Sequence, residues 1–271
     1  MKRMPGILAD RVALLVVLVV VLAGALLVAL SPAFRVGSVD VSGTRKLDSQ
    51  ALVAESGIVA GRSFLKGIGG DLSALIGLRY GGAEQHLLEA NPYLRSVQVR
   101  YRYPGRVSIE AVERVEVAYL AAHDAVVVID ADRVAVQVLQ GDPPAGIPLV
   151  EGIGITRYLL GGSVEVDRPA ALDDALLLLS AVLEADADTR GDLKLLSVVT
   201  SVRPAADGLI YLTVRLPATG RDLLVREDDP RNATTDMTML RYAILQGKFD
   251  DVGSGILDLS GDQNRFVPDG K

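Results

Sequence analysis

The 271-residue sequence contains no cysteine, no tryptophan and only two histidines, His86 and His123. The absence of cysteine excludes a disulfide-stabilised scaffold, a thiolate nucleophile and any metal site built on cysteine. The two histidines stand far apart and form no histidine-rich metal cluster. Aromatic residues make up only 4% of the chain, and the formal net charge is −6. An acidic chain is a poor nucleic-acid binder, because phosphate affinity comes mainly from clustered lysine and arginine.

Polar residues are also missing from one long segment near the start of the chain. Residues 12–30 read VALLVVLVVVLAGALLVAL, and no charged residue stands between Arg11 and Arg35. As a helix this run would span roughly 28 Å, close to the hydrocarbon thickness of a bilayer. A buried core helix of this length would rarely lack a polar face. We therefore predict a transmembrane helix over residues 12–31.

The charges before this run predict its orientation. Lys2, Arg3 and Arg11 stand against a single acid, Asp10, so residues 1–11 are expected to form a cytoplasmic tail with the rest of the chain outside. A cleaved signal peptide is the alternative, but its apolar core would be about 7–15 residues long. Without the three bases and one acid of the tail, 25 basic and 33 acidic residues remain outside, a net charge of −8. The exterior as a whole is therefore not a polybasic lipid-binding surface.

The first segment outside this run has a regular order of patterns. Residues 34–43 alternate as a strand, and LDSQALVAESGI carries a helix N-cap at Asp48 or Ser49 and a glycine stop. AEQHLLEANPYL predicts a second helix, and two alternating strands follow around the turn pair Pro104-Gly105. The glycine-rich residues 61–82 give no clear assignment. The expected order is strand, helix, helix, strand, strand.

This order resembles the POTRA domain of the FtsQ/DivIB family, bacterial cell-division proteins with one membrane anchor. The motifs that carry the resemblance are G-R-S-F at 61–64, N-P-Y-L at 91–94, Y-P-G-R-V-S-I-E at 103–110 and E-R at 113–114. The resemblance implies a POTRA domain over 34–112 and a second, β-rich domain over 113–271. Two features depart from the family pattern: Glu116 replaces a usual proline, and the 66–82 segment is longer than in many members.

The second outer segment is predicted to be a mainly antiparallel sheet with helices, which makes the fold class α+β. A hairpin is expected over 125–130 and 134–140, with Arg133 at a turn position where the family commonly has glycine. A long helix is expected over Pro169–Ala187, and another is supported by Met237, Leu240, Ile244 and Leu245. Further extended pieces are predicted at 195–202, 210–216, 223–227, 255–260 and 264–267.

Catalytic patterns are absent from the sequence. His123 stands beside Asp124, but a catalytic triad needs partners that converge in space, so a loop role is the simpler interpretation. GIGGD at 67–71 has no following Lys-Ser/Thr for a phosphate loop. The acids of 173–188 fit a solvated helix face, and ADAD lacks the ligand spacing of a Ca²⁺ loop. We therefore predict no enzymatic activity, no cofactor, no metal site and no small-molecule substrate.

The resemblance implies a scaffold of the division machinery, located in the cell membrane at the division septum. Its implied partners are the small single-pass proteins of the FtsB/DivIC and FtsL types, which link it indirectly to the septal peptidoglycan synthase. The alternative is an anchored transport or secretion accessory that handles polypeptides through its POTRA domain. A third interpretation, an anchored cell-wall enzyme, lacks a nucleophile set.

Partner docking is expected at the end of the chain, where I-L-D-L-S at 256–260 resembles the family's aspartate-leucine strand. A final strand with no later element to cover it leaves backbone N–H and C=O groups free to pair with a partner's strand. The candidate partner-binding residues are Leu257, Asp258, Leu259, Ser260, Gly261, Asp262, Gln263, Asn264, Arg265, Phe266 and Val267.

Overall fold

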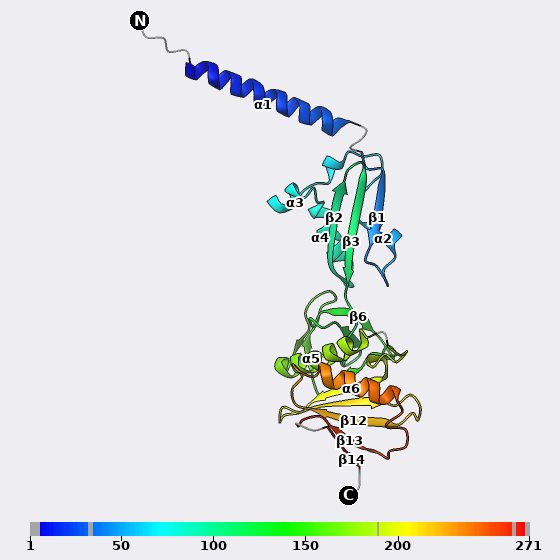
Figure 1. Ribbon diagram of the computed structural model, residues 1–271. Helices are drawn as coiled ribbons and strands as arrows, with labels where there is room; N and C mark the ends of the chain where they lie inside the picture. Colours follow the sequence, from blue (N-terminus) through cyan, green and yellow to red (C-terminus); the bar gives the residue numbers. More distant parts are fainter. Residues whose placement is uncertain (1–5, 32–34, 189, 262–263, 269–271) are drawn as a thin grey trace. The chain divides into compact units, whose positions relative to one another are not determined.

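The computed structural model describes residues 6–31, 35–188, 190–261 and 264–268 (Figure 1). The chain divides into two compact units, residues 1–113 and residues 114–271, each with its own hydrophobic core. Both units combine helices with strands, so the predicted α+β class is confirmed.

The apolar run near the start of the chain lies within one continuous helix, α1 (Gly6–Leu30). The four consecutive residues Leu14, Leu15, Val16 and Val17 are 53–73% exposed, so apolar side chains emerge on every side of the helix. Within the part of the chain that the structure describes, no helix is both long enough and apolar enough to cross a membrane.

The rest of the first unit is a three-stranded sheet covered by short helices. Its elements are β1 (Ser38–Ser42), α2 (Ser49–Glu55), the 3₁₀ turn η2 (Phe64–Lys66), α3 (Leu72–Ile76), α4 (Gly81–Ala90), β2 (Leu94–Arg102) and β3 (Arg106–Glu113). The strand order is β1-β3-β2, with β1 parallel and β2 antiparallel to β3. The predicted strand, helix, helix, strand, strand order is present, and the unassigned 61–82 segment adds η2 and α3.

Local side-chain chemistry explains where these elements begin. Asp48 accepts a hydrogen bond from the backbone N–H of Gln50 at 3.1 Å, which caps α2 as expected. Alternation buries Val99 and Tyr101 against the helices. The alternation ends there: the side chain of Tyr103 is 69% exposed, because β2 ends one residue earlier and Tyr103 belongs to the turn.

The second unit contains a nine-stranded sheet, a small two-stranded sheet and two longer helices. Its first elements are β4 (Ala118–Ala121), β5 (Val126–Ile129), β6 (Ala135–Leu139), β7 (Leu149–Val150), β8 (Ile155–Arg157), β9 (Glu165–Val166) and α5 (Pro169–Asp186). They are followed by the 3₁₀ turn η3 (Leu196–Val198), β10 (Val199–Pro204), β11 (Ile210–Arg215), β12 (Asp222–Glu227), α6 (Thr234–Leu245), β13 (Gly255–Asp258) and β14 (Arg265–Pro268).

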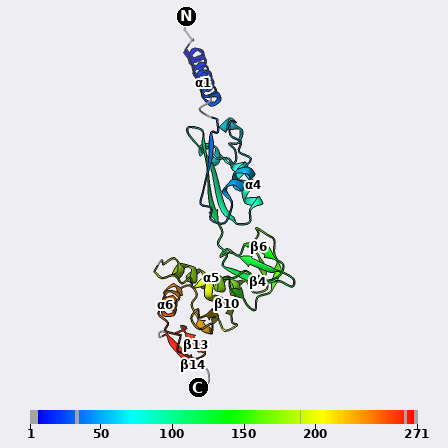
Figure 2. The same cartoon turned by 90° about the vertical axis from the view of Figure 1, so that its right-hand side faces the viewer.

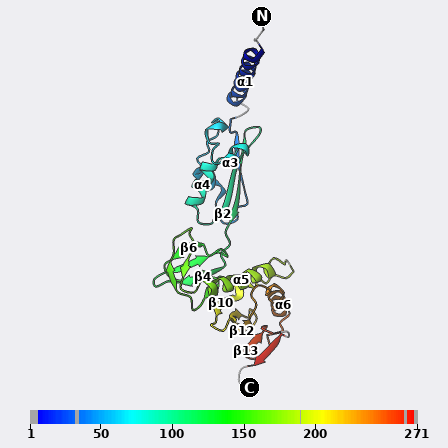
Figure 3. The same cartoon turned by 90° about the vertical axis from the view of Figure 1, so that its left-hand side faces the viewer.

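The large sheet has the order β14-β13-β12-β11-β10-β7-β4-β5-β6. Most neighbours are antiparallel, and three pairings are parallel: β7 with β4, β7 with β10, and β12 with β13. Helices α5 and α6 pack against each other, and their apolar residues join the sheet in one core. Figures 2 and 3 show β13 and β14 at one end of this sheet, far from β6.

Two details of the second unit differ from the sequence-based expectations, and a third, at Arg133, agrees with the expected turn position. The stretch expected as a strand from Leu195 begins as η3, because the Asp186 carboxylate accepts the backbone N–H groups of Leu195 and Leu196 at 2.6 and 2.9 Å and holds a turn there. Leu245 is 39% exposed at the end of α6 instead of buried. Arg133 adopts φ +63°, so a non-glycine residue occupies the left-handed turn position.

Candidate partner-binding edge

The predicted docking residues lie on β13, on β14 and in the turn between them. β14 forms one edge of the large sheet and pairs only with β13 among the described strands. Figure 1 shows β12, β13 and β14 as successive strands at this end of the chain. Asp262 and Gln263 lie outside the described residues. The remaining candidates divide into three groups with different surroundings.

The first group belongs to the hydrophobic core. Leu257 and Leu259 are only 8% and 6% exposed, and Phe266 packs partly buried against the same cluster. Leu257 and Phe266 are paired across the two strands, so they share the inner face of the sheet. These side chains fix the strands to the sheet and offer little surface to a partner.

The second group centres on Asp258, which fastens β13 to its inner neighbour. Its carboxylate pairs with the guanidinium of Arg226 on β12, with one Nε–Oδ1 distance of 2.9 Å, and it also accepts both the N–H and the hydroxyl of Ser260. The Arg226 and Ser260 hydrogen bonds lower the pKa of Asp258 to about 2. The aspartate of the I-L-D-L-S segment is therefore part of the sheet's internal bonding.

The third group is exposed: Gly261, Asn264, Arg265 and Val267. Asn264 makes one long side-chain contact, from its Nδ2 to Asp236 Oδ1 at 3.5 Å. The backbone around these residues forms the outer side of β14. Their use as a binding surface therefore depends on which N–H groups face outward.

A single backbone hydrogen bond defines that direction. The N–H of Leu259 donates to the carbonyl of Arg226 at 2.8 Å, so the polar backbone groups of Leu259 face β12. Successive residues in a strand direct their backbone N–H and C=O groups to opposite sides, so these groups of Asp258 face β14. Arg265, which is paired with Asp258, directs its backbone groups toward β13. By the same alternation, Asn264 and Phe266 direct their N–H groups toward the open side. Pro268, which has no N–H, falls on an outward position, as is typical for proline in an edge strand.

The opposite edge of the same sheet is partly covered. At the start of β6, the N–H of Ala135 donates to Gly162 at 2.9 Å and its carbonyl accepts from Gly161 at 2.8 Å. The N–H of Val164 donates to Arg133 at 2.8 Å. A segment of this chain therefore occupies part of the β6 edge, in contrast to β14.

The first unit also covers one of its sheet edges. Along the outer side of β2, the N–H of Tyr80 donates to Val99 at 2.8 Å, and the N–H of Tyr101 donates to Leu78 at 3.0 Å. The N–H of Val99 donates to the carboxylate of Glu84 at 2.8 Å. The 66–82 segment, which the sequence left unassigned, thus ends beside β2 and takes the place of a neighbouring strand.

The Glu-Arg pair gains a physical role that the sequence did not reveal. Glu113 accepts the backbone N–H groups of Arg45, Lys46 and Leu47 at 2.9–3.2 Å, which holds the loop before α2. Burial raises the pKa of Glu113, but these three donors outweigh it and lower the pKa overall. Arg114 instead donates to Asp130 at 2.6 Å inside the second unit. Each residue of the pair is thus anchored within its own unit.

Both histidines lie on the surface. His86 is exposed on α4, and His123 is exposed beside Asp124. No group of three or more histidine, aspartate or glutamate side chains within the described ranges is arranged to hold a metal ion. What the geometry of β14 can do chemically is to hydrogen-bond an extended polypeptide.

Comparison with known proteins agrees with this architecture. Residues 34–114 match the family described as POTRA domain, FtsQ-type. The chain is 29% identical over 121 residues to the cell division protein FtsQ of Corynebacterium glutamicum, covering 45% of this chain and 48% of that protein. It is 26% identical over 199 residues to the cell division protein FtsQ of Myxococcus fulvus, covering 73% and 61%. The chain thus spans about half to three-fifths of the length of these curated relatives.

A small three-stranded unit of this type, followed by a larger sheet with an open last strand, defines a POTRA-containing protein with a separate β-rich unit. Through this POTRA domain the chain is similar to the FtsQ/DivIB family, at modest sequence identity to the named relatives. The family resemblance seen in the short motifs is therefore confirmed.

Proposed function

We propose that this chain is a non-catalytic scaffold of bacterial cell division that binds other membrane-anchored division proteins outside the membrane. Two named relatives are cell division proteins, and both support a role in division. The observation that carries the binding part is the outward side of β14, where no described strand pairs with the backbone. An unpaired edge is a template for a partner's strand.

The proposed anchor is the segment that contains α1. Residues 12–30 are apolar without interruption, and apolar side chains emerge on every side of the helix where they are described. Exposed apolar side chains are unfavourable in water, which supports the proposal that this segment is buried in a bilayer. The bases Lys2, Arg3 and Arg11 favour a cytoplasmic N-terminus and an extracytoplasmic location for the rest of the chain. The expected location is the cell membrane at the division septum.

The proposed partners are FtsB/DivIC-like and FtsL-like single-pass proteins, with the septal peptidoglycan synthase linked through them. The partner would add a strand to β14 and use the N–H groups of Asn264 and Phe266. The exposed side chains of Arg265 and Val267 would contribute selectivity at the rim. The carboxylate of Asp258 would act indirectly, by holding β13 in place.

The edge assignment is tested by removing single N–H groups. Asn264→Pro deletes an outward N–H, so we expect an unchanged melting temperature and at least a roughly tenfold loss in capture of the FtsB/DivIC-like partner. Asn264→Ala is the matched control, because it removes the side chain and keeps the N–H. Arg265→Pro deletes an inward N–H and should instead destabilise the second unit by about 1–3 kcal/mol.

The measurement is co-purification of the full-length chain with its partner from membranes, with the melting temperature measured on the same preparations. If Asn264→Pro and Asn264→Ala capture partner equally well, the docking edge is not β14. A uniform envelope signal for the fluorescently tagged chain in dividing cells would instead contradict the division role itself.

A further inference from the structure

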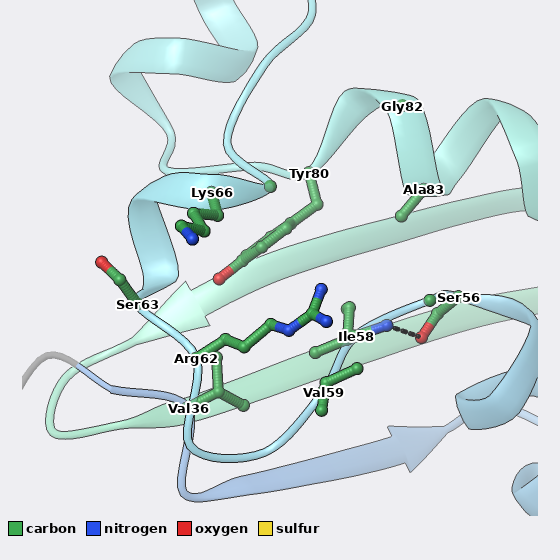
Figure 4. Close-up of a pocket in the computed structure, with 12 residues that line it drawn as sticks. Val36, Ser56, Ile58, Val59, Arg62, Ser63, Lys66, Tyr80, Gly82 and Ala83 are labelled. Carbon is green, nitrogen blue, oxygen red and sulfur yellow. Dashed lines mark hydrogen bonds between the residues drawn. The ribbon is translucent and has the colours of Figure 1, made fainter.

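A second candidate site lies in the first unit. A cavity of about 270 Å³ is lined by Val36 just before β1, by the 56–67 loop and by residues 80–83 at the beginning of α4 (Figure 4). The family resemblance assigns it no role, and the proposed scaffold function does not use it. Its lining combines apolar side chains such as Val36 and Ile58 with a small set of polar groups.

The charge of this lining is unusual for this chain. Arg62 and Lys66 both line the cavity, and none of its lining residues is acidic. Neither side chain has an ion-pair partner among the residues that the structure describes. The whole sequence carries a net charge of −6, so this spot is locally positive on an acidic protein.

A buried hydroxyl group adds a directional donor. Tyr80 is only 4% exposed, and its phenol oxygen has no hydrogen-bond partner in the described part of the chain. Burial raises the pKa of Tyr80 to about 12, so the phenol keeps its proton at neutral pH. Figure 4 shows the ring extending toward the side of the cavity where Lys66, Ser63 and Arg62 lie. A ligand oxygen would satisfy this unpaired buried donor.

The backbone around the ring contributes in two ways. Gly67 lies flat against Tyr80: a Cβ at this position would stand 2.3 Å from the ring, so glycine leaves the space that the ring occupies. Gly82 and Ala83 line the cavity in the first turn of α4, and the positive end of the ten-residue helix therefore faces it. No side chain caps this helix end.

We propose that this cavity binds a phosphate-type oxyanion, held by Arg62, Lys66, the Tyr80 hydroxyl and the N-terminus of α4. A tetrahedral oxyanion offers acceptor oxygens in several directions, which matches donors that come from three different segments. Arg62 and Lys66 are exposed, so their charged groups are accessible to an anion from solvent. The anion comes either from free phosphate or from a phospholipid headgroup. The headgroup is included because only five residues separate Val36 from α1, the proposed membrane anchor.

The test uses the full-length chain in neutral maltoside micelles at constant ionic strength. Inorganic phosphate is titrated against chloride while the backbone amide signals of Lys66, Gly82 and Ala83 are followed. We expect saturable shifts of these signals. Arg62→Ala/Lys66→Ala should weaken the affinity at least roughly tenfold, and Tyr80→Phe should weaken it about three- to tenfold without lowering the melting temperature.

The matched control is Arg231→Ala/Lys248→Ala, which removes the same two charges from exposed positions in the second unit. It should leave phosphate binding unchanged. A parallel series replaces phosphate by phosphatidylglycerol in the micelles. Shifts with the lipid identify a headgroup site, and shifts with phosphate alone identify a free-anion site; both support the proposal. Absence of saturable shifts with either ligand, or equal binding by the Arg62/Lys66 and control variants, would overturn it.

Discussion

The β2 edge of the first unit and the β14 edge of the second unit are treated in opposite ways. In the first unit, the outer side of β2 is paired with residues 78–80 and with the carboxylate of Glu84. In the second unit, β14 directs the N–H groups of Asn264 and Phe266 outward, and no described segment accepts them. Unpaired edges promote unwanted association, so proteins usually cover them. An edge left open in a chain that covers another is a candidate for a specific partner.

The difference rests on a few buried polar contacts rather than on strand composition. Glu84 is 7% exposed and accepts from Arg79 at 2.9 and 2.5 Å as well as from the N–H of Val99. It therefore joins the covering segment, the helix α4 and the strand β2. At the other edge, the carboxylate of Asp258 on β13 binds inward to Arg226 on β12 and makes no bond along the outer side of β14 among the described residues.

The largest expected effect comes from breaking the covered edge. Glu84→Ala leaves the N–H of Val99 and the partly buried guanidinium of Arg79 without their acceptor, so we expect a loss of about 3 kcal/mol in the stability of the first unit. Chemical denaturation of the full-length chain measures this loss. Glu89→Ala on the same helix is the control, because Glu89 is exposed and accepts a hydrogen bond from the exposed Gln85. Equal stability of the two variants would mean that Glu84 does not secure the edge.

A second buried glutamate, Glu227, makes the stability of the second unit depend on pH. Glu227, at the end of β12, is 2% exposed, and one of its oxygens has no partner in the described part of the chain. Burial, reinforced by the charges of Asp236 and Asp228, raises its pKa from 4.5 to about 7. The folded state therefore binds the proton more tightly than the unfolded state. This stabilisation is complete below pH 4.5 and is lost as the pH rises to about 7.

Glu227→Gln removes the titrating group and should abolish this pH dependence. We expect the variant to be roughly 2 kcal/mol more stable than the parent chain at pH 8 and about equally stable at pH 4.5. Denaturation of both proteins across this range tests the sign directly. A difference that is constant with pH would show that Glu227 titrates normally.

A smaller effect is expected at the fastening of the open edge. The pKa of Asp258 is lowered from 3.8 to about 2, so its bond to Arg226 stabilises the fold above pH 3.8 and is lost as the pH falls toward 2. Asp258→Asn should cost about 1 kcal/mol at pH 7, allowing for partial solvent screening, and nothing at pH 2. Asp142→Asn, at an exposed residue, is the control. Equal losses at both pH values would contradict the ion-pair explanation.

Local patterns in the sequence predict much of this fold because they record which face is buried. Alternation around Pro104-Gly105 predicts the hairpin, and Asp48 predicts the start of α2 by capping it. The 66–82 segment gives no such signal, because its conformation depends on backbone hydrogen bonds from Leu78 and Tyr80 to β2, which is distant in the sequence. The same limit applies to η3, which depends on Asp186.

The candidate site could be predicted only in outline. A terminal extended segment is visible in the sequence, but its two leucines and Asp258 turn inward, toward the core and Arg226. The direction of each N–H depends on the register between β12, β13 and β14, and a shift of one residue would reverse it. Only the three-dimensional strand pairing shows that the N–H of Asn264 faces outward and that the N–H of Arg265 faces β13.

Amide hydrogen exchange at β14, with and without the FtsB/DivIC-like partner, tests the central claim most directly. In the free chain, the Phe266 N–H faces solvent and should exchange fast, whereas the Val267 N–H faces β13 and should already be protected. Partner binding should slow exchange at Phe266 at least roughly tenfold, as expected for a new backbone hydrogen bond, and change Val267 little. A saturated complex in which Phe266 exchanges as fast as in the free chain would contradict strand addition at this edge.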